Sequence, residues 1–434
     1  MLSIRSWLQA GAVALLASIY GPALIRTFHV LGVFRQGKSS IVDAADMVVI
    51  EDTGHCEDLH LHAPSNTLFA ACEGSDTRFS WFPALGTLDD PIKAMNSRGS
   101  IHAIDPKTFK SKRLQLENFD GPFITHGIDV ISDPDKPDAV YIFAVNHLPH
   151  PAYVDYKKNE AAQNVEPPSP KAASQIEVFY HVLGSPTAKR VRSIQHPLVK
   201  TPNDVLARSP TSVYVTNDHY YREGHMRVLE DAFFGGKWSD TVHIQIEQLS
   251  EPDPTLGLKA TIALTGLHNN NGLGHGGSPN EIAIVSATSG DLHMAHVANG
   301  GALEVLETIH LDSGGDNPSF FRDAYATADN DSSGYVVPGL ARVIDVGKTA
   351  KDPEGIDPVM VWLVRPRQQG GAAGQAPVWE KKLLFEDDGT RIRSASGAVL
   401  IGIDPKLEGG RKKAWLFVTG FSSANAVAVK VDLE

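Results

Sequence analysis

Cysteine is scarce in this 434-residue sequence, which contains only Cys56 and Cys72. Two cysteines are too few for a disulfide-rich scaffold, and their spacing is not that of a zinc cluster. A single bridge is compatible with the sequence. So is a buried thiol at Cys72, because that residue ends an apolar run.

Clusters of basic residues are also missing. The chain has 39 Lys and Arg against 51 Asp and Glu, and its basic residues form no stripe that could follow a phosphate backbone. The sequence therefore predicts no nucleic-acid partner. Surplus carboxylates commonly form a solvated surface, but they also supply ligands for a hard cation such as calcium.

Neither a long amphipathic helix nor a Gly-x-Ser-x-Gly motif is recognisable. Gly74-Ser75 and Ser396-Gly397 lack the flanking residues of that motif. A serine nucleophile of the α/β-hydrolase kind is therefore excluded. Ser396-Gly397 is better interpreted as a turn that enters a strand.

One long apolar run is present, and it lies at the N-terminus. No residue from Ser6 to Ile25 is charged, and the run is just long enough to span a bilayer. Its position also suits a secretory signal or an uncleaved signal anchor. We predict that residues 1–40 form an apolar helix followed by a polar joint, and that the helix directs the protein into the secretory pathway. The protein would then be secreted or membrane-anchored. The alternative is a short membrane helix without export. The sequon Asn330-Asp331-Ser332 agrees weakly with a glycoprotein.

Residues 41–434 consist of short apolar runs separated by turn residues. The runs have the length and the β-branched or aromatic content of strands. The clearest are 100–105, 139–145, 175–180, 212–216, 241–246, 281–285, 291–297 and 414–420. Two stretches, 148–174 and 365–377, interrupt this pattern and are predicted to be exposed loops.

Several runs share a local pattern in which Gly or Ser precedes a strand that ends in a polar turn. Examples are 99–105, 289–297 and 400–405. Such loose repetition is typical of propeller blades that lack a family signature. A β-sandwich uses similar strands, but the number of runs favours repeated four-stranded blades. We therefore predict that residues 41–434 form one all-β propeller domain.

Carboxylates and amides recur in apolar, turn-like settings where a solvated charge would not normally lie. They occur at Glu57-Asp58, Asn203-Asp204, Asn271 and Asp316-Asn317. Each site alone is explained by an ordinary turn. Together they offer the oxygen ligands that calcium requires, and a propeller brings distant inner strands to one central channel. The sequence therefore predicts a calcium site at the mouth of that channel.

Two histidines, His126 and His147, flank one strand-rich segment. A lone histidine beside an apolar strand is commonly a hydrogen-bonded core or loop residue. A pair can instead supply a base that activates water and a relay for its proton. Both interpretations stay open from the residues alone.

Seven short motifs, taken in order, resemble the paraoxonase/arylesterase family. They are Glu57-Asp58-Leu59, His126-Gly127-Ile128, Val145-Asn146-His147, Asn203-Asp204-Val205, Thr216-Asn217-Asp218-His219-Tyr220, Asn271-Gly272-Leu273 and Asp316-Asn317. Their order and approximate spacing agree from about Val48 to the C-terminus. The resemblance implies a six-bladed β-propeller that hydrolyses lactones and aryl esters, with a small-molecule substrate as its partner.

The resemblance also implies two calcium ions and their ligands. The catalytic calcium would be bound by Glu57, Asn203, Asn271, Asp316 and Asn317. The structural calcium would be bound by Asp58, Asp204 and the backbone carbonyl of Ile128. The catalytic histidine dyad would be His126 and His147. Mammalian members have a disulfide that joins the start of the propeller to its last residues. This chain ends Val431-Asp432-Leu433-Glu434, so we expect strand pairing to close the ring.

This residue set predicts a hydrolytic mechanism. Calcium would polarise a substrate carbonyl, and His126 would deprotonate water if its pKa stays near neutral, with His147 passing the proton outward. Phe119, Phe123 and Tyr220 are expected to contribute to a hydrophobic pocket, with core packing as the alternative. The rival interpretations are a gluconolactonase-like or strictosidine-synthase-like propeller with one metal or none, and a noncatalytic, membrane-anchored propeller scaffold.

Overall fold

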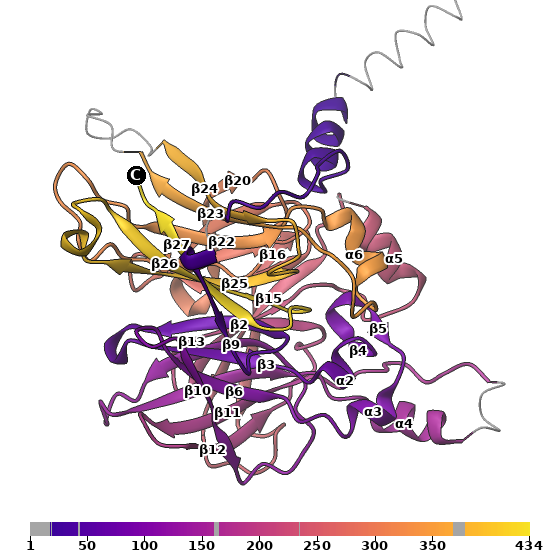
Figure 1. Cartoon of the computed structure of the whole chain (residues 1–434). Coiled ribbons are helices and arrows are strands. Elements are labelled where there is room, and N and C mark those ends of the chain that lie inside the picture. The colour runs from indigo at the N-terminus through magenta and orange to yellow at the C-terminus, as the bar shows by residue number, and fades with distance from the viewer. Residues whose placement is uncertain (1–17, 19, 42–43, 160–164, 234, 368–377) are drawn as a thin grey trace, which may run out of the picture.

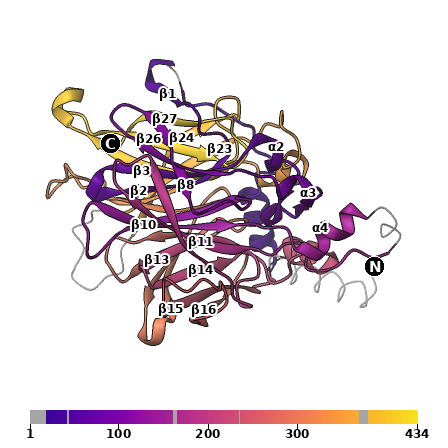
Figure 2. The same cartoon turned by 90° about the horizontal axis from the view of Figure 1, so that it is seen from below.

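The computed structural model describes residues 18, 20–41, 44–159, 165–233, 235–367 and 378–434. Within these residues, six antiparallel sheets surround a common centre (Figures 1 and 2). The first strand of each sheet contacts the first strand of the next, and the contacts run round to the starting sheet. The predicted all-β, six-bladed propeller is confirmed.

Each blade is a meander in which successive strands pair from the inside outward. Blade 1 consists of β2 (Cys56–His62), β3 (Thr67–Cys72), β6 (Ser100–Asp105) and β7 (Lys110–Arg113). Blade 2 consists of β9 (Thr125–Ser132), β10 (Ala139–Asn146), β11 (Gln175–Val182) and β12 (Thr187–Ile194), and β8 (Gln115–Glu117) pairs in parallel with β12. Blade 3 consists of β13 (Pro202–Ser209), β14 (Ser212–Asn217), β15 (Ser239–Ile246) and β16 (Leu258–Leu267). Blade 4 consists of β17 (Asn270–His275), β18 (Glu281–Ser286), β19 (Asp291–Val297) and β20 (Leu303–His310). Blade 5 consists of β21 (Ser319–Phe321), β22 (Gly334–Leu340), β23 (Val359–Pro366) and β24 (Trp379–Asp387).

Blade 6 closes the ring with strands from both ends of the domain. Its strands are β25 (Ala395–Ile403), β26 (Lys413–Gly420), β27 (Ala426–Asp432) and β1 (Met47–Ile50). β1 pairs antiparallel with β27, so that Met47 lies opposite Val429 and Ile50 opposite Ala426. Closure by strand pairing, as expected from the sequence, is confirmed.

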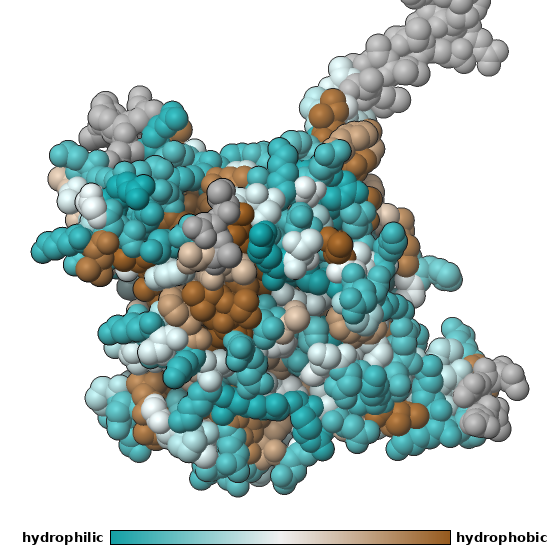
Figure 3. Space-filling view, viewed as in Figure 1, coloured by the Kyte–Doolittle hydropathy of each residue, from teal (hydrophilic) through white to brown (hydrophobic). Residues whose placement is uncertain are grey.

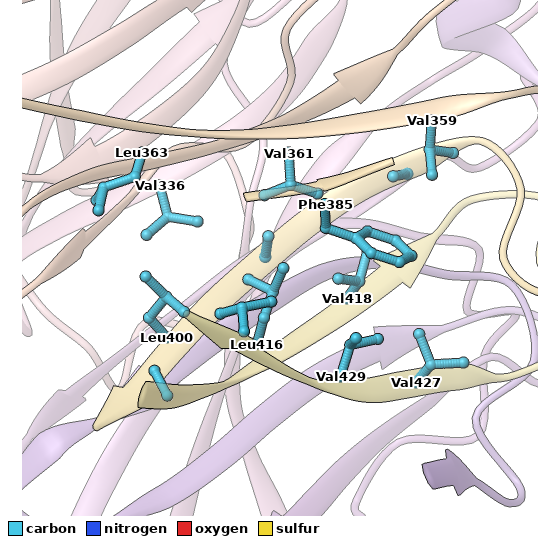
Figure 4. Packing of buried hydrophobic residues seen from close by; sticks show 14 of the residues in the cluster. Val336, Val359, Val361, Leu363, Phe385, Leu400, Leu416, Val418, Val427 and Val429 are labelled. Carbon is cyan, nitrogen blue, oxygen red and sulfur yellow. The ribbon is translucent and has the colours of Figure 1, made fainter. Parts of the chain in front are cut away.

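Apolar side chains fill the spaces between neighbouring blades. Between blades 5 and 6, Val336, Val361 and Leu363 belong to one buried cluster with Leu400, Leu416, Val418 and Val429 (Figure 4). Fully burying one such side chain stabilises the fold by roughly 1.5–3 kcal/mol. These interblade clusters fix the inner strands, and therefore the residues that face the channel.

All the labelled short helices gather on one face of the propeller, together with the hairpin β4 (Trp81–Phe82) and β5 (Thr87–Leu88) (Figure 1). The helices are α2 (Ser75–Arg78), α3 (Pro91–Ala94), α4 (Pro151–Lys158), α5 (His225–Ala232) and α6 (Val346–Thr349). They belong to insertions between blade strands. They cover the mouth at which the candidate site lies.

The first of the two predicted loops, 148–174, contains the helix α4, on which Tyr153 and Val154 are buried. Tyr153 packs with Trp81 and Leu88 of the β4–β5 hairpin and with Ile124. In the second loop β23 extends to Pro366, and residues 368–377 lie outside the described residues.

Most of the predicted apolar leader also lies outside the described residues. Residues 20–30 are helical, and they expose Tyr20, Leu24 and Ile25. Figure 3 shows hydrophobic surface on this helix. Arg26 forms an ion pair with Asp291 at 2.6 Å, which holds this helix against blade 4. In the part of the chain that the structure describes, no helix is both long and apolar enough to cross a membrane.

The two cysteines form a disulfide. Cys56 on β2 lies directly opposite Cys72 on β3, and their sulfur atoms are bonded. The open question from the sequence is thus answered in favour of the bridge. It links the first two strands of blade 1 beside Glu57.

Candidate active site

The five residues predicted to bind a catalytic calcium all lie at the inner ends of blades. Glu57 lies on β2, Asn203 on β13, Asn271 on β17, and Asp316 with Asn317 just before β21. Four of these residues are buried and Asn271 is partly exposed. Segments separated by up to 260 positions therefore meet, since Asn317 Nδ2 donates to Glu57 Oε1 at 3.1 Å.

Each of these five residues has a buried oxygen without a hydrogen-bond partner among the described residues. The oxygens are Glu57 Oε2, Asn203 Oδ1, Asn271 Oδ1, Asp316 Oδ1 and Asn317 Oδ1. A buried acceptor left unpaired costs roughly 1–3 kcal/mol, so five of them around one channel require a common partner. Carboxylate and amide oxygens are the ligands that calcium takes. The residues present fit that ion.

The charges of the site favour the same partner. Burial and the neighbouring Asp58 carboxylate raise the pKa of Glu57 to about 8. Burial, Glu57 and Asp58 raise the pKa of Asp316 well above its ordinary value. A divalent cation would oppose this shift, because it stabilises the ionised form of each carboxyl.

Amide oxygens are indispensable to this set. Across the described ranges, no group of three or more His, Cys, Asp or Glu side chains is arranged to hold a metal ion. Glu57 and Asp316 are the only carboxylates among the five predicted ligands. The donor set is therefore that of a hard cation such as calcium, not of zinc.

The residues predicted for a structural calcium have different surroundings. Asp58 accepts hydrogen bonds from the backbone N–H groups of Leu59 and Ile128, and Asp204 from those of Val205 and Leu273. Each carboxylate thus joins its own inner strand to that of the next blade.

Asp129 on β9 makes the same kind of link, to the Ala207 N–H of blade 3 at 2.7 Å. The unpaired oxygens that mark the first set are therefore not found at Asp58 and Asp204. Burial nevertheless raises the pKa of Asp58 to about 6. Burial and Asp58 raise that of Asp204 well above its ordinary value.

The two predicted catalytic histidines are brought together. His126 Nδ1 lies 3.1 Å from His147 Nε2, and the rings meet edge to face. On its other side, His126 Nε2 lies 3.5 Å from Glu57 Oε1. His147 Nδ1 is 2.8 Å from Ser174 Oγ. The chain of contacts therefore runs from Glu57 through both rings to Ser174, a residue that no sequence motif singled out.

Burial dominates the acid–base properties of this pair. Desolvation, then His147 and Arg78, lower the pKa of His126 well below its ordinary value. Desolvation also lowers the pKa of His147, to about 4. The near-neutral pKa that was the condition for His126 acting as the base is not found. Both rings are neutral at pH 7 and can accept a proton.

A cavity of about 350 Å³ opens above these residues. Its floor includes Glu57, His126, Asn203, Asn271 and Asp316. Its apolar wall comes from insertions, and includes Phe82, Leu85, Val343, Val346 and Phe421. Phe82 lies 5.2 Å from the His126 ring centroid, so the wall reaches the candidate base.

The aromatic residues expected from the sequence do not line this cavity. Phe119 and Phe123 pack with Phe179 in the core between blades 1 and 2, as the core-packing alternative predicted. Tyr220 is 49% exposed, and its ring is covered by the Lys200 ammonium at 4.2 Å. The pocket prediction was wrong for all three, because the insertions that build the wall have no local sequence signal.

A charged wall completes the cavity. His219 lies between two carboxylates, with Nδ1 3.0 Å from Asp218 Oδ1 and Nε2 2.5 Å from Asp231 Oδ1. Asp218 and both hydrogen bonds raise the pKa of His219 against the effect of burial. Arg227 on α5 lines the same wall. Asp218 and His219 belong to the distinctive motif 216–220, but the sequence assigned them no role.

The chain is similar to several known proteins. One curated relative is serum paraoxonase/arylesterase 2 of Gallus gallus, which is 27% identical over 230 residues, covering 52% of this chain and 55% of that protein. Another is serum paraoxonase/arylesterase 1 of Mus musculus, which is 26% identical over 197 residues, covering 45% of each chain. The chain spans about half the length of the curated relatives it matches. Among solved structures, a luciferin-regenerating enzyme has a TM-score of 0.42 at 9% identity, covering 89% of this chain and 94% of that one.

A family model described as arylesterase matches residues 92–324. The matched region contains both predicted catalytic histidines and the predicted ligands Asn203, Asn271, Asp316 and Asn317, whereas Glu57 precedes it. The match covers more than half of the chain. The chain belongs to the arylesterase family.

Proposed function

We propose that this protein is a calcium-dependent hydrolase of lactones and aryl esters. The observation that carries the proposal is the set of five unpaired buried oxygens, four of them on residues that line the cavity floor, beside a buried histidine pair. Calcium bound there would polarise the substrate carbonyl and stabilise the developing oxyanion. The carboxylates of Glu57 and Asp316 would balance the charge of the bound ion, and the three amides, which are neutral, would leave it electrophilic.

The protein's own groups supply water activation and exclusion. His126 is neutral and can take a proton from a water molecule near its Nε2, on the side that faces Glu57. The proton can pass from Nδ1 to His147 Nε2, 3.1 Å away. Because the pKa of each ring is low, each ring is a weak base that takes a proton from water poorly and gives it up readily. Hydrolysis would therefore depend on a polarised substrate carbonyl that water attacks easily. Phe82 and Phe421 keep bulk water from this centre.

Two rival functions are less well supported. A gluconolactonase-like or strictosidine-synthase-like propeller shares the fold, but nothing in such a reading accounts for the family match or the histidine pair. A noncatalytic scaffold would gain nothing from five unpaired buried oxygens. A second, structural calcium at Asp58, Asp204 and the Ile128 carbonyl stays part of the proposal, as do the secretory route and attachment to a membrane through the apolar leader.

The direct test uses purified full-length protein on aryl acetates and on γ- and δ-lactones, with calcium and after treatment with a chelator. We expect hydrolysis with calcium and its loss on chelation, reversed by added calcium. Asp316→Ala should lower both calcium content and turnover, whereas Asp312→Ala, at a residue whose side chain is 46% exposed, should change neither. Full activity in protein shown to be free of calcium would overturn the mechanism.

A further inference from the structure

Arg227 is a buried cation in the wall of the cavity. Its residue is 5% exposed, and it lies on α5, the short helix inserted between β14 and β15. An arginine is rarely buried this deeply unless its guanidinium has partners. Its hydrogen bonds therefore need to be accounted for one by one.

One of the three guanidinium nitrogens, Nη2, has a hydrogen-bond partner among the described residues, and Nε has only an ion-pair contact. Nη2 donates to the Ala84 carbonyl at 2.6 Å, and Nε lies 3.5 Å from Asp231 Oδ2. Nη1 has no hydrogen-bond partner among the described residues, although it is buried. A free donor on a buried guanidinium costs more than a neutral one, so this position is suited to a ligand.

The nearby carboxylates do not fully compensate this charge. Asp231 is shared with His219, to which it lies closer (2.5 Å), and its side chain is 51% exposed. Asp218 is engaged by His219 at 3.0 Å. Of the other cationic groups in the lining, Lys351 is paired with Asp89 at the rim, and His219 lies between Asp218 and Asp231. Arg227 is thus a buried cationic lining residue with a donor left free.

We propose that Arg227 binds a carboxylate carried by the substrate at a distance from the scissile carbonyl. The preferred substrates are then esters or lactones with an acidic tail. The inference rests on the proposed hydrolase function and adds the substrate class. Charge-assisted binding of a carboxylate by Nη1 would supply the partner that the buried guanidinium lacks, while the apolar wall packs against the carbon chain between the two groups.

Three esters with one leaving group test this subsite. They are the mono-4-nitrophenyl ester of adipic acid, its methyl ester and 4-nitrophenyl heptanoate, which present a carboxylate, a neutral oxygen acceptor and an alkyl tail. We expect wild-type kcat/KM to be about tenfold higher for the acid than for its methyl ester, in line with one charge-assisted hydrogen bond. The ratio should fall toward one in Arg227→Met and stay above one in Arg227→Lys.

The matched control is Arg208→Met, because Arg208 donates to Pro279 and Asn280 and does not line the cavity. It should keep the wild-type ratio. Equal kcat/KM for acid and methyl ester in wild type, or an unchanged ratio in Arg227→Met that melts normally, would overturn the subsite. The subsite would also be overturned if the acid and its methyl ester had equal kcat/KM values that both exceeded the value for the heptanoate. A neutral oxygen acceptor would then be enough for recognition, and no carboxylate would be needed.

A binding measurement separates this inference from the proposed function. Calorimetry with adipate and with hexanoate needs no turnover, and we expect adipate to bind about tenfold more tightly to wild type but not to Arg227→Met. If none of the three esters is hydrolysed, the proposed function fails and calorimetry alone decides the subsite. Equal affinity for the two acids in wild type would refute it.

Discussion

Replacing Glu57 with glutamine preserves the shape of the side chain and removes its charge, so it distinguishes the calcium-free site from the loaded one. Without a cation the Glu57 pKa is raised from 4.5 to about 8. A carboxyl whose pKa is higher in the folded state costs stability as the pH rises from the unfolded value to the folded value. At pH 7, with about 1.4 kcal/mol for each pKa unit, the cost is about 3 kcal/mol.

In chelator at pH 7, Glu57→Gln should therefore unfold at a higher temperature than wild type, by roughly 3–4 °C for a chain of this size. At pH 5 the difference should nearly vanish, because most of the cost arises above that pH. In calcium the order should reverse. Wild type gains about 4.1 kcal/mol when calcium is at 1,000 times its Kd, which exceeds the cost of about 3 kcal/mol, whereas the variant has lost one of two charged ligands.

The assay is thermal unfolding followed by circular dichroism at both pH values, with chelator and with calcium. Glu304→Gln is the matched control, because the Glu304 side chain is 64% exposed on β20 and should shift neither curve. If Glu57→Gln destabilises the chelated protein and keeps the wild-type response to calcium, the unpaired oxygen of Glu57 has another partner and the candidate site is wrong.

Two further changes test the surroundings of the site. His126→Gln should lower lactone turnover by roughly a hundredfold or more while calcium content, measured by atomic emission, is retained; loss of the metal together with activity would instead make His126 structural. The double change Cys56→Ser and Cys72→Ser removes a bridge across a sequence separation of 16 and should lower the free energy of unfolding by roughly 3 kcal/mol in urea titrations. An unchanged urea midpoint would contradict that expectation.

The strands could be predicted because their periodic pattern is local. The expected runs 100–105 and 291–297 coincide with β6 and β19, and the run 139–145 differs from β10 by one residue. The blade number came from the family resemblance, since strand runs alone do not fix how many blades close a ring. The helix α4 was missed because its stability comes from Tyr153 and Val154 packing on distant residues, not from its own eight-residue sequence.

The cavity wall could not be predicted for a related reason. Phe82, Arg227 and Phe421 reach one cavity from insertions in blades 1 and 3 and from the end of β26. No local pattern says which insertion folds over the channel or which side chain turns inward. The floor was predictable because its residues occupy equivalent positions in successive blades, where the fold itself sets their direction.

That equivalence has a structural cause in the inner strands. In a regular strand, consecutive side chains point to opposite faces, so a pair such as Asn203-Asp204 could not both face the channel side. The ladder register shifts beside Glu57 on β2, beside His126 on β9, at Asn203 and Asp204 on β13, and at Asn271 on β17. A bulge of this kind re-aims side chains.

Glycine makes the close approach of these bulges possible. A Cβ on Gly127 would lie 2.2 Å from Asp204 Oδ1, and one on Gly272 would lie 2.5 Å from the Asn317 Cα. Blade 6 repeats the arrangement, because the register of β25 shifts at Ser396 and the buried Ser396 Oγ has no partner among the described residues. Polar residues beside glycine at the start of an inner strand are therefore the sequence signal of the channel floor. Ser396-Gly397 carries that signal too, and its interpretation as a turn hid this further unpaired oxygen.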